Sequence, residues 1–170
     1  MSAIKTEQEQ VKQFAHAEAT RYMNNATETL QKAGKEDYQY LDDKYVRTAC
    51  GIAHLGVLKA LDAYFELRGV PLPPKKKHKN IEFYTYHAAR LDGKLSKDLH
   101  DAYRILHIEG YYEGVCEVAT IKSGFDIACR IIARIKPERE LTQEEYKALK
   151  ARKKPAWLRA LYSLYSLFFV

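Results

Sequence analysis

Apolar residues recur at helical spacing along most of the chain, and this pattern predicts a protein built from helices. The first stretch covers residues 4–33, where apolar side chains return every three or four positions and no proline interrupts. The second covers residues 42–68 and is closed by Gly69. Gly51 and Gly56 lie inside this second stretch, where we expect them to permit the close approach of a neighbouring helix.

Shorter periodic stretches, divided by turn residues, predict five more helices in the rest of the chain. They cover residues 80–90, 96–110 or 97–110, 118–136, 143–152 and 156–170. Gly110 is expected to end the helix that precedes it. Thr142, with Glu145 three residues later, is a capping-box signature. No alternation typical of strands is visible, so no sheet is expected.

The predicted fold is therefore all-α: an antiparallel helical bundle of about five to seven helices, because helices joined by short loops pack side by side. A length of 170 residues is typical of one domain. We expect residues 1–170 to form a single helical-bundle domain, in which residues 137–170 are a C-terminal helical extension.

The composition indicates a globular protein with a moderately basic surface. Charged residues of both signs make up 29% of the chain, and no run approaches the roughly 20 apolar residues that a membrane span needs. The first residues lack the features of a secretory signal, which favours the cytoplasm. A net charge of +6 favours contact with phosphates or an acidic partner, and the 13 tyrosines suit interfaces and base stacking.

The histidines and cysteines predict neither a metal site nor a bound cofactor. No pair has the HExxH or CxxC spacing of metal ligands, and GxGxxG, P-loop and GxSxG motifs are missing from the sequence. The three cysteines lie far apart in apolar surroundings and are expected to be buried thiols.

The segment AYRILHIEGYYEGV, residues 102–115, gathers polar and aromatic side chains and is the first candidate site. In one interpretation it is only a helix end whose tyrosines cover the core. In the other, Arg104 offers a planar fork to a phosphate or carboxylate, and Tyr111 or Tyr112 stacks on a base. His107 and Glu109 belong to the same candidate site.

A run of basic residues is the second candidate site. It consists of Lys75, Lys76, Lys77, His78 and Lys79, and it precedes the aromatic helix IEFYTYH. Such a run is either a solvated loop or, together with the aromatic rings, a surface for single-stranded nucleic acid.

The order of these segments resembles the HEPN helical bundles, in particular an uncharacterised bacterial branch of that superfamily. The resemblance spans residues 5–136 and is carried by a long first helix, YVRTACGIAHLGVLKALDAYFELRG, a basic loop, and LHDAYRILHIEGYYEGV leading into IKSGFDIACRIIARI. Because bundles of this superfamily commonly pair, the resemblance implies a homodimer. The apolar C-terminal run WLRALYSLYSLFFV could pack within its own subunit or across the dimer.

In ribonuclease members of that superfamily, the turn between the last two bundle helices carries an arginine and, after four to six residues, a histidine. This sequence departs from that pattern, since Glu109, Gly110 and Tyr111 follow Arg104 at those positions and His107 comes too early. Arg47 and His54 have the permitted spacing.

Those two residues lie on the second predicted helix rather than at the turn. The sequence therefore favours a non-enzymatic HEPN-like protein that binds a nucleic acid, a nucleotide or a protein partner. The alternative is a metal-independent ribonuclease of a toxin–antitoxin system that uses Arg47 with His54, or Arg104 with His107.

Overall fold

The computed structural model describes residues 2–71 and 79–151, and in these ranges the chain forms an all-α bundle, as predicted. Its helical segments are α1 (Ser2–Gln31), α2 (Asp43–Leu67), α3 (Ile81–Leu91), α4 (Gly93–Ala102), the π-helix η1 (Tyr103–Glu113), α5 (Val118–Ala133) and α6 (Gln143–Ala151). The helix expected over residues 156–170 lies outside the described residues. No helix in the described ranges has the length and apolar character to cross a membrane.

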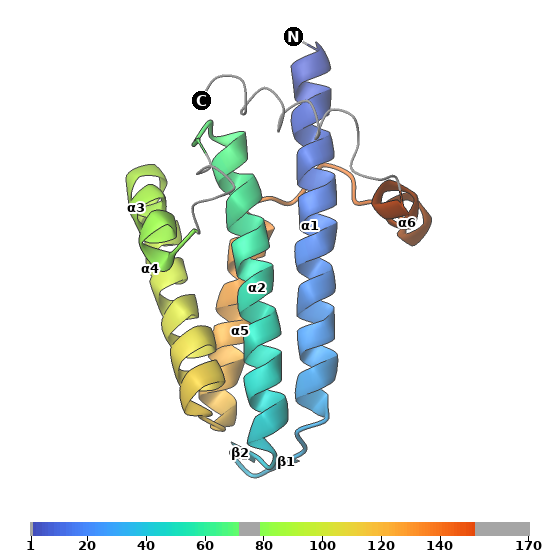
Figure 1. Cartoon of the computed structure of the whole chain (residues 1–170). Helices are drawn as coiled ribbons and strands as arrows, with labels where there is room; N and C mark the ends of the chain where they lie inside the picture. Colours follow the sequence, from blue (N-terminus) through green and yellow to red (C-terminus); the bar gives the residue numbers. More distant parts are fainter. Residues whose placement is uncertain (1, 72–78, 152–170) are drawn as a thin grey trace.

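Helices α1, α2 and α5 run side by side with α4 and η1 and form the body of the bundle (Figure 1). Helix α2 lies at its centre, between α1 on one side and η1 on the other, and it also packs on α5. Helix α4 continues directly into η1, so the two make one helical rod that packs against α5. Helix α6 lies apart from the others, on the outer side of α1 (Figure 1).

The core is made of apolar side chains that these helices bury between them. Its largest fully buried members include Phe65, Leu61, Leu99, Leu106 and Ile121. Burying each such side chain contributes about 1.5–3 kcal/mol relative to leaving it in water.

A close contact between α1 and α2 supports this core. A Cβ atom at Gly56 would lie 3.1 Å from the Cβ of Tyr22 and 3.3 Å from the carbonyl oxygen of Ala19. The expectation that Gly56 permits the approach of a neighbouring helix is confirmed.

Polar side chains cap the helices where the sequence indicated starts. Asn80 accepts a hydrogen bond from the backbone N–H of Phe83, and Thr142 and Glu145 make the reciprocal bonds of a capping box. The start of α4 differs from the prediction, because Asp92 accepts bonds from the N–H groups of residues 94 and 95. The helix therefore begins at Gly93 rather than at residue 96 or 97.

A small β-hairpin corrects the expectation that no strands form. Strand β1 (Lys35–Glu36) pairs antiparallel with β2 (Gln39–Tyr40), and the hairpin is tied to the segment before α5. The N–H of Tyr40 donates to the carbonyl of Cys116 at 2.9 Å, and the N–H of Val118 donates to the carbonyl of Tyr38 at 2.8 Å. Strands of two residues are too short to show alternation, so the pattern missed them.

The prediction that Gly110 ends its helix is also wrong. The helical rod continues through Gly110 to Glu113 and ends at Gly114, which has the left-handed backbone (φ 76°) that glycine adopts at helix ends. Gly110 is instead buried against Cys50 of α2. Cys50 is a buried thiol as expected, whereas Cys116 is half-buried and Cys129 is exposed.

Candidate functional site

The π-helix η1 brings together candidate residues that are far apart in the sequence. The ring of His54, on α2, lies 4.7 Å from the ring of His107 and 5.9 Å from that of Tyr103, measured between centroids. Tyr103 and His107 are 5.0 Å apart. π-Helices are rare and occur frequently at functional sites. We call these three rings, together with Tyr111 and Tyr112, the aromatic–imidazole cluster.

The cluster extends from the interior to the surface. His107 stacks nearly parallel to Tyr111, with an interplanar angle of 13° and centroids 6.0 Å apart, and it meets Tyr112 edge to face at 5.0 Å. Tyr111 and Tyr112 are 44% and 63% exposed, whereas His54 is 7% exposed. Two tyrosine rings in contact with water therefore rest on rings that the fold holds in place.

Gly51 makes room for the outer part of the cluster. A Cβ atom at this position would lie 3.1 Å from Cδ2 of Tyr111. Gly51 therefore does permit a close approach, as the sequence predicted, and the group that approaches is the side chain of Tyr111.

Arg47 holds the end of η1 in place. Its Nη1 donates hydrogen bonds to the carbonyl oxygens of Tyr111 and Tyr112, and its Nη2 donates to that of Glu113. Its Nε donates to the carboxylate of Asp43 at 2.9 Å. The last carbonyls of a helix have no partners within the helix, so Arg47 satisfies groups that would otherwise need water. These contacts use four of the five N–H groups of its guanidinium.

Burial keeps both imidazoles of the cluster uncharged at neutral pH. It lowers the pKa of His54 to about 4, with a smaller contribution from neighbouring His107. The Nδ1 atom of His54 has no hydrogen-bond partner within the described residues. Burial also lowers the pKa of His107. The centre of the cluster therefore offers flat, neutral rings that can stack without bringing a charge.

Arg104 and Glu109 lie on a different face of the rod from the cluster. They form an ion pair with each other and line a shallow hollow against α5, beside Ala119 and Thr120. Arg104 therefore has a partner already, and it is not brought into the stack that contains His107.

Only Lys79 of the basic run lies within the described residues, because residues 72–78 are outside them. Its ammonium nitrogen is 2.7 Å from the carboxylate of Asp62, which also accepts a hydrogen bond from the hydroxyl of Tyr84 at 2.9 Å. This lysine therefore fixes the start of α3 against α2.

Tyr103 is a site residue that the sequence analysis missed. Tyr103, His107 and Tyr111 are spaced four residues apart, a spacing that places side chains along one side of a helix. Ending the helix at Gly110 hid this series. No three His, Cys, Asp or Glu side chains within residues 2–71 and 79–151 are arranged to hold a metal ion.

Comparison with known proteins gives a family and a structural relative. No curated protein matches the sequence. A solved structure, described as a protein of unknown function from Dyadobacter fermentans, is 38% identical with a TM-score of 0.64, and the match covers 73% of this chain and 94% of that chain. This description does not mention HEPN bundles, and neither does the description of the matching family that is given below. The resemblance to HEPN bundles therefore stays a prediction.

The family match extends over most of the bundle and includes the whole aromatic–imidazole cluster. It covers residues 14–137, from within α1 to beyond the end of α5. Over this range the chain belongs to the family described as a domain of unknown function, DUF5618.

Proposed function

We propose that this protein is a non-enzymatic binding protein whose aromatic–imidazole cluster holds the bases of single-stranded nucleic acid. The observation that carries the proposal is the stack itself: exposed Tyr111 and Tyr112 rest on His107, which rests on buried His54. Stacking a base on an aromatic ring contributes about 1–3 kcal/mol, and it tolerates any base because every base has a flat face. Rings that are already held in place lose little freedom on binding.

The charge of the chain supports the same ligand class. A net charge of +6 attracts phosphates, and this attraction adds to stacking without reading sequence. A free nucleotide would engage the same rings, but it would gain from one base only. A strand that spans both exposed tyrosines is therefore the preferred ligand.

The positions of the two arginines support binding over the ribonuclease alternative. The guanidinium of Arg47 is occupied by three carbonyls and a carboxylate, and that of Arg104 pairs with Glu109. A cleaving arginine has to face the phosphodiester. Arg104 lies on a different face of the rod from the imidazoles, and the guanidinium of Arg47 keeps only one N–H group for a phosphate.

The proposal predicts that single-stranded RNA is retarded in an electrophoretic assay at low salt and released as salt rises. Tyr111→Ala combined with Tyr112→Ala should weaken binding about tenfold or more, because two stacking platforms are lost. A control variant, Tyr38→Ala, removes a ring that is 75% exposed at the β-hairpin and outside the cluster, and it should bind as the unaltered protein does.

The same gels test the alternative function. The RNA should stay intact during incubation. Cleavage that disappears in both His54→Ala and His107→Ala would favour a ribonuclease. Absence of retardation at low salt, or equal loss of binding in the control variant, would contradict the stacking proposal.

We also propose a HEPN-like, cytoplasmic, bacterial protein that forms a homodimer, on the basis of the resemblance over residues 5–136. Light scattering should give a mass about twice that of the 19.7 kDa chain at micromolar concentration. A mass of one chain throughout that range would rule the dimer out.

A further inference from the structure

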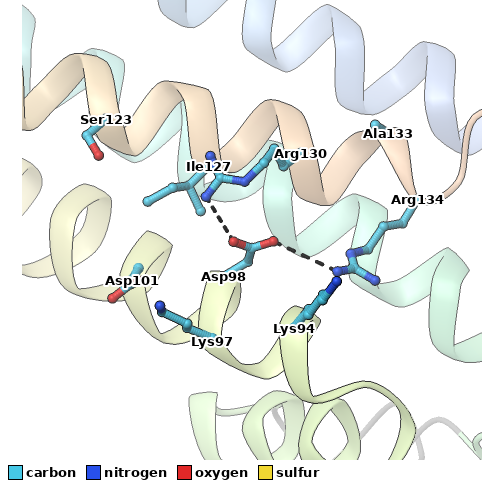
Figure 2. Close-up of a pocket in the computed structure, with 9 residues that line it drawn as sticks. All are labelled: Lys94, Lys97, Asp98, Asp101, Ser123, Ile127, Arg130, Ala133 and Arg134. Carbon is cyan, nitrogen blue, oxygen red and sulfur yellow. Dashed lines mark hydrogen bonds and ion pairs between the residues drawn. The ribbon is translucent and has the colours of Figure 1, made fainter.

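A charged groove runs between α4 and α5, on a different face of the α4–η1 rod from the aromatic–imidazole cluster. It has a volume of about 710 Å³, within the range of small-molecule sites. Lys94 and Lys97 line it from α4, and Arg130 lines it from α5, together with Arg134 directly after that helix (Figure 2). Four cationic side chains therefore face one hollow.

A single carboxylate holds the two arginines in position. Asp98 lies between them in Figure 2, with one oxygen 2.9 Å from Nη2 of Arg130 and the other 3.9 Å from Nη2 of Arg134. Its side chain is only 17% exposed. Arg134 is held a second time by Asp92, the cap of α4. The guanidinium groups are thus oriented in advance, and each keeps N–H groups for another acceptor.

The two lysines carry charge that nothing in the described residues neutralises closely. Neither ammonium group lies within 4 Å of a carboxylate oxygen in residues 2–71 and 79–151. The four cations face three carboxylates, because Asp98 and Asp101 line the groove and Asp92 pairs with Arg134. The two arginines are held by Asp98 and Asp92, so the two ammonium groups are the charges that a bound anion can pair with.

We propose that the groove binds the phosphate monoester group of a small molecule. A phosphate monoester is doubly charged near neutral pH and has three acceptor oxygens, which suit guanidinium forks on one wall and mobile ammonium groups on the other. The diester groups of RNA carry one charge and two free oxygens each, so they offer less than a monoester to two ammonium groups and a guanidinium together.

Space for the rest of such a molecule lies next to the cationic part of the groove. A second hollow of about 570 Å³ meets the first at Ser123 and extends along η1 past Arg104 and Thr120. The proposal goes beyond the stacking function, because it uses none of the rings that pack over α2.

The test is a titration of the full chain with glycerol 3-phosphate at constant ionic strength, followed by nuclear magnetic resonance of the backbone amides. We expect saturable shifts on α4 and α5. Lys94→Gln combined with Lys97→Gln should weaken binding about tenfold, because hydrogen bonds to charged groups are lost. These variants break no close ion pair of the described residues, so the fold should be retained.

A charge-matched control replaces Lys32 and Lys59, exposed lysines outside the groove, and should bind as the unaltered chain does. Shifts that do not saturate, or that the control loses equally, would overturn the proposal. Two further titrations, one with vesicles that contain phosphatidate and one with single-stranded RNA, test whether the phosphate group belongs to a lipid or to a nucleic acid. Binding to the vesicles alone, or shifts of these amides with the RNA alone, would overturn the small-molecule assignment.

Failure of this experiment would leave the stacking proposal untouched. That proposal depends on Tyr111 and Tyr112, which do not line the groove.

Discussion

Gly110→Ala is expected to destabilise the protein by about 3 kcal/mol, because the new methyl group has no space between α2 and η1. A Cβ atom at this position would lie 2.5 Å from Sγ and 2.9 Å from Cβ of Cys50, and 3.1 Å from the carbonyl oxygen of Ile105. Cys50 is fully buried, and the carbonyl belongs to the helix backbone. Neither can turn aside, so the two helices must separate and loosen the stack above His54.

Urea unfolding followed by circular dichroism measures this effect. Gly93→Ala is the matched control, since no atom lies within 4 Å of a Cβ there and its backbone is not left-handed. It should leave stability unchanged or raise it slightly, because alanine is the better helix former. Combining Gly110→Ala with Cys50→Ala should recover part of the loss. Equal stabilities of Gly110→Ala and Gly93→Ala would show that the contact between α2 and η1 is looser than described.

The second large effect is a loss of stability in mild acid that depends on His54. The pKa of this residue is about 4 in the folded chain and about 6.5 in an unfolded one, so the unfolded state takes up its proton first as pH falls. The stability it contributes is complete above pH 6.5 and is lost progressively as pH falls to 4. The total loss is about 3 kcal/mol. Burial lowers the pKa of His107 as well, which acts in the same direction.

The comparison that isolates His54 is the difference between the unaltered protein and His54→Gln, measured by urea unfolding at several pH values. Titrating groups that do not contact His54 cancel in this difference, which should shrink as pH falls from 7 to 4. A parallel curve for His54→Gln would contradict the role of burial.

Local signals in the sequence predicted most of the fold. Apolar periodicity located the helices, and Asn80 and Thr142 marked starts that the structure confirms, because capping depends on neighbouring residues only. The role of Gly110 was predicted wrongly because the missing side chain of glycine has two uses. It allows a helix to end, and it allows a neighbouring helix to approach closely. Which of these holds depends on Cys50, which is 60 positions earlier in the sequence.

The candidate site was only partly predictable for a related reason. Tyr111 and His107 stood out as residue types, but their contact with His54 depends on how η1 packs against α2. The ion pair of Arg104 with Glu109 depends on the π-helix. Residues five apart lie on different sides of an α-helix, whereas a π-helix bonds residue i to residue i+5 and brings them close.

The cap that Arg47 places on η1 has a consequence for how this family can diverge. Gly114 keeps a left-handed backbone, and a Cβ atom there would collide with Nη2 of Arg47. Position 114 is therefore restricted twice, once by its own geometry and once by a side chain from another helix. A side chain at position 114 would displace the guanidinium of Arg47 from the carbonyls that it caps. We therefore expect relatives that replace Gly114 to differ at position 47 as well.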